Sequence, residues 1–254
     1  MGKSKTWNQI RRRFDQRRHS ALLAAIVSLL LVRAVIGDSV VAPLLFSLAV
    51  VVLVMVAHYT IQVDELVGDR EVLLVEKRRR TIAGWTLAIA VTFERVMVWI
   101  APSHTLYVIG AICYLIFFAY ITFQLLRGVL RQREISAETI CMSISVYLLM
   151  GLTWGFLFAL IYDRHPNAFS FPASTAPLTE RTIPPTLTYF SFTTLSTIGF
   201  GDITPVTMQA RYAAVAEGIT GQFYLAILVA RLVGMHMSQS EVRRRDKQQL
   251  ESRG

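Results

Sequence analysis

Three long stretches of the chain contain no Asp, Glu, Lys or Arg, and they limit the possible folds more than any other feature. They run over Ser39–Val63, Leu106–Leu126 and Thr139–Tyr162. A bilayer core about 30 Å thick is crossed by roughly 20 apolar residues in a helix that rises 1.5 Å per residue. Each stretch reaches this length, so each predicts a membrane-spanning helix.

Three further apolar stretches carry a few charges and predict spanning helices as well. They are Ala21–Ile36 with Arg33, Ile82–Ala101 with Glu94 and Arg95, and Tyr212–Ala230 with Glu217. Only 17% of the 254 residues are charged, below the roughly 25% of an ordinary soluble domain. The sequence therefore predicts an all-α membrane protein with six transmembrane helices. The absence of metal-ligand spacing and of a phosphate-binding loop argues against a soluble enzyme.

The positive charges are distributed unevenly between the predicted loops. Most of the 26 Lys and Arg residues lie before Ala21, between Val63 and Thr81, from Arg127 to Arg133, or after Gly234. Lys and Arg are retained on the cytoplasmic side of short loops, so both termini are predicted to be cytoplasmic. The basic amino terminus is interpreted as part of this topology signal, and no nucleic-acid partner is expected.

The apolar pattern is interrupted between the last two predicted spans. Arg164–Pro185 holds five of the eight prolines and predicts an exposed outer loop. Thr186–Ser196 follows as a short apolar, hydroxyl-rich stretch, too short to cross a bilayer, and Thr197–Asp202 then reads Thr-Ile-Gly-Phe-Gly-Asp. Non-helical backbone is tolerated at membrane depth only where protein or a water-filled cavity surrounds it. These residues therefore predict a pore helix over Thr186–Ser196 and a re-entrant loop.

Thr193–Asp202, with Pro205 three residues on, resembles the potassium channel family. The resemblance covers Thr139 to about Met237, and the first four helices match six-helix channels only in number. Glu217–Gln222 and Ala230–Gly234 make the last span similar to that of small bacterial members without large cytoplasmic domains. The resemblance implies a re-entrant pore helix, a selectivity filter and a location in a bacterial-type cell inner membrane.

The residues of the loop suit the chemistry of potassium permeation. Stacked rings of backbone carbonyls replace the hydration shell of the ion, which requires a left-handed backbone at alternating residues. Gly199 and Gly201 adopt that conformation at little steric cost. Potassium ions are expected at Thr197, Ile198, Gly199 and Phe200. Because each chain has one such loop, a closed ring requires a homotetramer with fourfold symmetry.

Three residues are expected to support this filter from behind. The Asp202 carboxylate needs a hydrogen-bond donor from the pore helix, and Tyr189 is the candidate by its position. Family members often have Trp there, and some have Glu at the position of Thr193. Phe200 replaces the commoner tyrosine and has no phenolic hydroxyl to donate to the filter wall.

No arginine-rich voltage-sensing helix is present in the sequence. Leu106–Leu126 lies where such a helix is expected and contains no ionised side chain for the membrane potential to act on. Arg33 and Glu94 lie equally far from the inner ends of their helices, so a buried ion pair between them is predicted. This pair fits a static brace or a moving element.

The last span contains a charge and three glycines whose roles stay open. Glu217 either faces the cavity, where a carboxylate ring concentrates cations, or braces the pore helix. Gly218, Gly221 and Gly234 are candidate hinges, and close helix packing is the alternative explanation. With few residues after Met237, no separate ligand-binding domain is expected there.

The sequence thus predicts four parts of the chain. They are a cytoplasmic basic segment over 1–20, a four-helix membrane domain over 21–137, a pore domain over 138–237 and a short cytoplasmic tail over 238–254. The predicted function is a potassium-selective channel with no enzymatic activity and no cofactor apart from permeant potassium ions. Membrane lipids, anionic ones included, are expected partners besides the chain itself. The alternatives are a weakly selective cation channel and a non-conducting membrane sensor or assembly subunit.

Overall fold

The structure is a computed structural model, and it describes most of the chain from Arg18 onward. The described residues are 18–36, 49–50, 52–53, 55–57, 86, 89, 93, 97, 103–132, 136–172, 178–179 and 182–251. The predicted spans over Ser39–Val63 and Ile82–Ala101 therefore lie largely outside the described residues.

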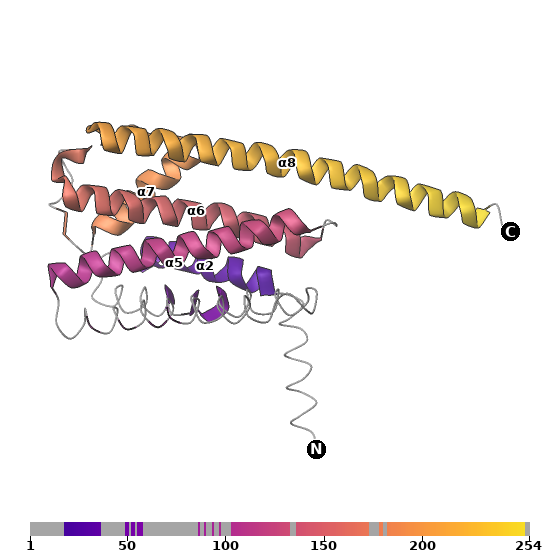
Figure 1. The fold of residues 1–254 in the computed structure, drawn as a ribbon, viewed down its shortest axis with the longest axis horizontal. Helices are drawn as coiled ribbons and strands as arrows, with labels where there is room; N and C mark the ends of the chain where they lie inside the picture. Colours follow the sequence, from indigo (N-terminus) through magenta and orange to yellow (C-terminus); the bar gives the residue numbers. More distant parts are fainter. Residues whose placement is uncertain are drawn as a thin grey trace, which may run out of the picture.

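Helices account for nearly all of the described structure (Figure 1). The elements are α2 (Arg18–Ile36), α5 (His104–Arg131), α6 (Ala137–Arg164), a short 3-10 helix η1 (Pro166–Ala168), β1 (Phe169–Ser170), α7 (Ile183–Leu195), β2 (Thr204–Pro205) and α8 (Met208–Glu251). Helix α6 lies at the centre and contacts α2, α5, α7 and α8.

Three of the described helices are long and apolar enough to cross a membrane. They are His104–Arg131, Ala137–Arg164 and the Met208–Met235 part of α8. They contain the predicted spans over Leu106–Leu126, Thr139–Tyr162 and Tyr212–Ala230. The first predicted span, Ala21–Ile36, lies within helix α2.

Serine residues set the starts of α5 and α6. The Ser103 hydroxyl accepts a hydrogen bond from the Leu106 backbone N–H at 3.3 Å, and the Ser136 hydroxyl accepts one from the Thr139 N–H at 3.1 Å. Such caps satisfy N–H groups that lack a partner within the helix. Both helices consequently begin before the uncharged stretches that predicted them.

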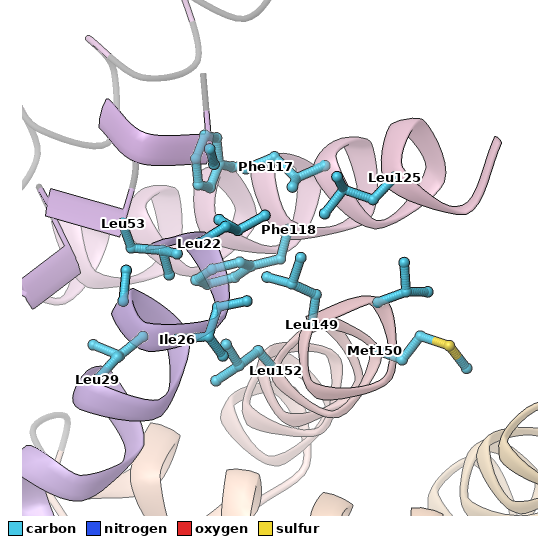
Figure 2. Packing of buried hydrophobic residues seen from close by; sticks show 14 of the residues in the cluster. Leu22, Ile26, Leu29, Leu53, Phe117, Phe118, Leu125, Leu149, Met150 and Leu152 are labelled. Carbon is cyan, nitrogen blue, oxygen red and sulfur yellow. The ribbon is translucent and has the colours of Figure 1, made fainter. Parts of the chain in front are cut away.

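A large apolar core joins α2, α5 and α6. Figure 2 shows Leu22 and Ile26 of α2 facing Phe118 of α5 and Leu149 of α6. The Phe118 ring also stacks on Phe156 of α6, with a centroid distance of 5.6 Å. This core anchors α6, so α6 can act as a fixed support for α7 and α8.

One acidic side chain of α6 caps the start of α2. The Glu138 carboxylate accepts hydrogen bonds from the backbone N–H groups of His19 at 2.9 Å and Ser20 at 3.3 Å, and from the Ser20 hydroxyl. The carboxylate lies near the positive end of the α2 dipole, where a negative charge is stabilising. Glu138 therefore fastens α2 to α6 at the end of both helices that is predicted to be cytoplasmic.

Helix α7 starts earlier than predicted. It begins at Ile183 rather than Thr186, so Pro184 and Pro185 belong to the helix and not to the preceding loop. Proline is tolerated in the first turn because the N–H groups there have no partner within the helix. Two further features of the described residues were not predicted, the 3-10 helix η1 and the antiparallel pairing of β1 with β2.

Helix α8 is much longer than the predicted span over Tyr212–Ala230. Its 44 residues correspond to about 66 Å at 1.5 Å per residue. This is roughly twice the thickness of a bilayer core. Its carboxyl-terminal part projects beyond the ends of the other helices (Figure 1). The predicted tail over 238–254 is thus helical as far as Glu251.

Candidate functional site

The loop between α7 and α8 has an alternating backbone. Over Thr197–Asp202, here called the TIGFGD loop, φ is 60° at Thr197, 52° at Gly199 and 78° at Gly201. No other described residue has a positive φ. Alternation of this kind allows successive carbonyl groups to lie on one side of the chain. The left-handed backbone predicted at both glycines is present, and Thr197 extends the pattern.

The glycines of the loop are required by backbone conformation and not by space. A Cβ atom added at Gly199 or Gly201 meets nothing within 4 Å. Both positions nevertheless have a positive φ, which glycine adopts without steric penalty. Thr197 is β-branched, so its own positive φ costs roughly 1–3 kcal/mol.

Backbone hydrogen bonds hold the start of the loop against the end of α7. The Thr197 N–H donates to the Thr194 carbonyl at 3.0 Å, and the Gly199 N–H donates to the Thr193 carbonyl at 3.0 Å. These bonds compensate for the strain at Thr197 by fixing the residues on either side. The position of α7 therefore determines the position of the loop.

The far end of the loop is fixed by the predicted contact between Tyr189 and Asp202. The Tyr189 hydroxyl donates to Asp202 Oδ2 at 2.8 Å, and the Ile203 N–H donates to Oδ1 at 3.0 Å. The hydrogen bond to Asp202 raises the pKa of the Tyr189 phenol above its usual value, so the phenol keeps its proton at neutral pH. The Phe200 ring lies nearly parallel to the Tyr189 ring, with a centroid distance of 6.4 Å.

Thr193 forms a hydrogen bond to the loop through its backbone and one within α7 through its side chain. Its hydroxyl donates to the Phe190 carbonyl within α7 at 2.8 Å, while its carbonyl accepts the Gly199 N–H. Thr193 was predicted to support the filter. Within the described contacts, Tyr189 is the α7 side chain that bonds to Asp202.

A buried polar contact joins α8 to α7 and α6. Glu217 is fully buried, and its Oε1 atom is hydrogen-bonded to the Ser191 hydroxyl. The same hydroxyl lies 2.7 Å from the Gly151 carbonyl of α6. Of the two roles left open for Glu217, this geometry is that of a brace against α7. Ser191 and Gly151 were not predicted, because nothing in the local pattern indicates which helix faces Glu217.

Two tyrosines provide further polar links behind the loop. The Tyr147 hydroxyl of α6 donates to the Leu195 carbonyl at the end of α7 at 3.1 Å. The Tyr224 hydroxyl of α8 donates to the Ser143 carbonyl of α6 at 2.7 Å. Buried phenolic hydroxyls usually find a hydrogen-bond partner. A tyrosine inside an apolar stretch is therefore the sequence feature from which these two contacts could have been predicted.

The three glycines of α8 have different surroundings. A Cβ atom at Gly221 would lie 2.7 Å from Leu195 Cδ1 and 2.9 Å from the Leu195 carbonyl oxygen. At Gly218 and Gly234 it would meet nothing within 4 Å. Helix α8 continues through all three positions. Gly221 is thus a packing residue at the contact between α7 and α8.

A hydrogen bond joins α8 to α5 near the end of α5. Arg231 Nη2 donates to the carbonyl of Gln132, the residue that caps the end of α5, at 2.5 Å.

The predicted pair of Arg33 and Glu94 lies outside the described residues, which include neither Glu94 nor the Arg33 side chain. Within the described residues, no cluster of His, Cys, Asp and Glu is suited to a metal ion.

Comparison with known proteins gives one match. Residues 146–237 match the family model described as an ion channel. The matched segment begins within α6, contains α7 and the TIGFGD loop, and ends within α8. No curated protein and no solved structure matches the chain. Residues 146–237 are thus similar to the ion channel family, and three of the described helices are long and apolar enough to cross a membrane.

Proposed function

We propose that the protein is a potassium-selective channel in which four chains surround one pathway. The observation that carries this proposal is the positive φ at Thr197, Gly199 and Gly201. A potassium ion enters a pore only where oxygen atoms replace its hydration shell. A loop in which left-handed and right-handed backbone conformations alternate presents carbonyl oxygens for this purpose. The carbonyls of Thr197, Ile198, Gly199 and Phe200 line the filter, and the Thr197 hydroxyl closes its inner end.

The exposure of the loop supports a homotetramer. Within one chain, Ile198 is 59% exposed and Phe200 is 67% exposed, although both are large and apolar. On α8, the exposed residues Tyr212, Val215, Ile219 and Phe223 follow one another at three- or four-residue spacing and form a single face. Neighbouring chains in a fourfold ring cover these residues and complete the wall behind the filter.

The orientation of α7 favours a cation at the inner side of the filter. Helix α7 ends at Leu195, directly before the TIGFGD loop. The carboxyl end of a helix carries a partial negative charge of roughly half an elementary charge. Four such ends directed towards one axis attract a cation before it enters the filter.

The outer helices fit a role in the membrane without a conventional voltage sensor. Ile109, Ile112, Ile116 and Phe123 form an exposed apolar face on α5, which suits contact with lipid tails. Charged residues are absent from Leu106–Leu126, so membrane potential has no charge there to move. Permeation is passive, in a cell membrane with both termini on the cytoplasmic side.

The direct test is ion flux through the purified protein in liposomes. The wild-type chain is expected to carry barium-sensitive potassium flux, with reversal potentials that follow the potassium gradient and not the sodium gradient. Equal potassium and sodium permeability would support the weakly selective channel. Absence of any flux from a correctly assembled tetramer would support the non-conducting subunit.

A matched pair of glycine variants shows whether the flux depends on the alternating backbone. Gly201→Ala and Gly218→Ala each add one methyl group where there is free space, but only Gly201 has a positive φ. An L-residue in the left-handed region costs about 1–2 kcal/mol, so Gly201→Ala is expected to lower flux at least about tenfold. Gly218→Ala is expected to leave flux near wild type. Equal flux in the two variants would contradict the proposed filter.

A further inference from the structure

The Ser191 hydroxyl has two acceptor oxygens beside it and one hydrogen to donate. Its oxygen lies 2.7 Å from the Gly151 carbonyl oxygen and is hydrogen-bonded to Glu217 Oε1. A carbonyl oxygen has no hydrogen, and neither has an ionised carboxylate. If Glu217 were ionised, one of the two contacts would join two oxygens with no hydrogen between them. A second hydrogen is needed, and the Glu217 carboxyl group is the group that can supply it.

The surroundings of Glu217 agree with this count of hydrogens. The side chain is fully buried, and its Oε2 atom has no hydrogen-bond partner among the described residues. In the described part of the chain, no Lys, Arg or His forms an ion pair with Glu217. Burying a carboxylate without a cation costs much free energy. Burying the unpaired carbonyl oxygen of a neutral acid costs less.

The other titratable groups described on the packed helices donate their hydrogens elsewhere, so they do not supply the second hydrogen at Ser191. Tyr147 of α6 is the group facing Glu217, and its hydroxyl donates to the Leu195 carbonyl. Tyr189, on α7, donates to Asp202 at the outer end of the loop. Tyr224, about two helical turns beyond Glu217 on α8, donates to the Ser143 carbonyl.

We propose that Glu217 is a neutral carboxylic acid that donates its proton to Ser191, while Ser191 donates to the Gly151 carbonyl. This hydrogen-bond chain fixes α8 and α6 on either side of α7. Ser191 lies two residues before Thr193, whose carbonyl holds the Gly199 N–H. Glu217 is therefore a positioning residue that acts on the filter through α7. The positioning role of Glu217 rests on the proposed channel function.

Infrared spectroscopy of the full-length protein in liposomes tests the protonation state without reference to ion flux. The wild-type spectrum is expected to contain the C=O stretch of a buried carboxylic acid that disappears in Glu217→Gln. In Ser191→Ala the band is expected to remain but to shift, because the acid has lost its acceptor. A band that is identical in wild type and Glu217→Gln would overturn the proposal.

Potassium flux through the same liposomes tests the positioning role. Glu217→Gln keeps a neutral donor of the same length, so at least about half of the wild-type flux is expected to remain. Glu217→Met keeps the approximate volume but cannot donate, and a fall of about tenfold is expected, as for the loss of one buried hydrogen bond. Ser191→Ala should lower flux similarly and serves if Glu217→Met does not assemble. Wild-type flux in assembled Glu217→Met or Ser191→Ala would overturn the positioning role.

The two measurements separate failure of this inference from failure of the proposed function. A wild-type protein that shows the acid band but carries no ion would contradict the channel function, while the neutral state of Glu217 would stand. A conducting wild-type protein without the band would contradict the inference alone.

Discussion

The Tyr189 hydroxyl donates a 2.8 Å hydrogen bond to Asp202 Oδ2 and thereby ties the far end of the TIGFGD loop to the middle of α7. The start of the loop is tied to the same helix by the Gly199 N–H, which donates to the Thr193 carbonyl at 3.0 Å. The loop is therefore held at two points by one short helix. Its shape can change only if one of these contacts breaks or if α7 itself moves.

Removal of the Tyr189 hydroxyl is expected to make the filter less durable. Tyr189→Phe keeps the ring but loses a hydrogen bond worth about 0.5–1.5 kcal/mol, or up to about tenfold in a rate. Conduction should decay faster during sustained opening, which macroscopic current recordings measure. Tyr162→Phe also removes one phenolic hydroxyl, from a tyrosine of α6 whose ring contacts Phe171 and not the loop, and is the control. An unchanged decay rate in Tyr189→Phe would remove the supporting role of this contact.

The same hydrogen bond predicts a dependence on alkaline pH. The pKa of Tyr189 is raised above 10.0 by the hydrogen bond to Asp202. A group with a raised folded-state pKa stabilises the folded form below its unfolded pKa, and the contribution is lost as pH rises through the folded pKa. Decay should therefore be constant near neutral pH and accelerate above about pH 10. Tyr189→Phe should lack this acceleration; equal acceleration in both proteins would assign it to another group.

A methyl group at Gly221 is expected to destabilise the contact between α7 and α8. The added Cβ would lie 2.9 Å from the Leu195 carbonyl oxygen, which belongs to the backbone and cannot rotate away. Overpacking costs about 1–3 kcal/mol, more than the roughly 1 kcal/mol that alanine gains over glycine in a helix. Gly221→Ala should lower the melting temperature of the detergent-solubilised protein.

Gly234→Ala is the control for Gly221→Ala, because its added Cβ meets nothing within 4 Å. The melting temperature of this variant should equal or exceed that of wild type, since alanine is the better helix former. If the two variants melted alike, close packing at Gly221 would not explain the glycine.

Loss of the Glu138 carboxylate is expected to weaken the attachment of α2. Glu138→Ala leaves the N–H groups of His19 and Ser20 without this acceptor, and loss of a helix cap costs about 1 kcal/mol. Thermal unfolding should begin at a lower temperature. Asp163→Asn is the control at the other end of α6, where Asp163, with a side chain 10% exposed, pairs at 3.7 Å with His104, with a side chain 65% exposed. Such pairs contribute roughly 0–1 kcal/mol, so a larger effect in the control would contradict the assigned role of Glu138.

The ends of α5 and α6 show how far helix boundaries can be predicted from residue types alone. The uncharged stretches Leu106–Leu126 and Thr139–Tyr162 lie inside the two helices, but both helices extend further, to His104–Arg131 and Ala137–Arg164. Charges mark where a chain leaves the hydrocarbon of the membrane, whereas a helix ends where its last N–H and C=O groups find other partners. The ends of a span and the ends of its helix are therefore different quantities, and α8 shows the largest difference.

The sequence by itself determined the position and backbone of the TIGFGD loop, because Gly199 and Gly201 act through conformational freedom that needs no neighbour. It also identified three stretches that lie in helices long and apolar enough to cross a membrane. Only the tertiary structure decided that Glu217 meets Ser191, that Gly221 is a packing residue, and that the Thr193 hydroxyl bonds to the Phe190 carbonyl. These contacts depend on how each helix is rotated about its axis and which helix lies beside it. Both are set by packing against distant residues such as Gly151 and Leu195 and not by local spacing.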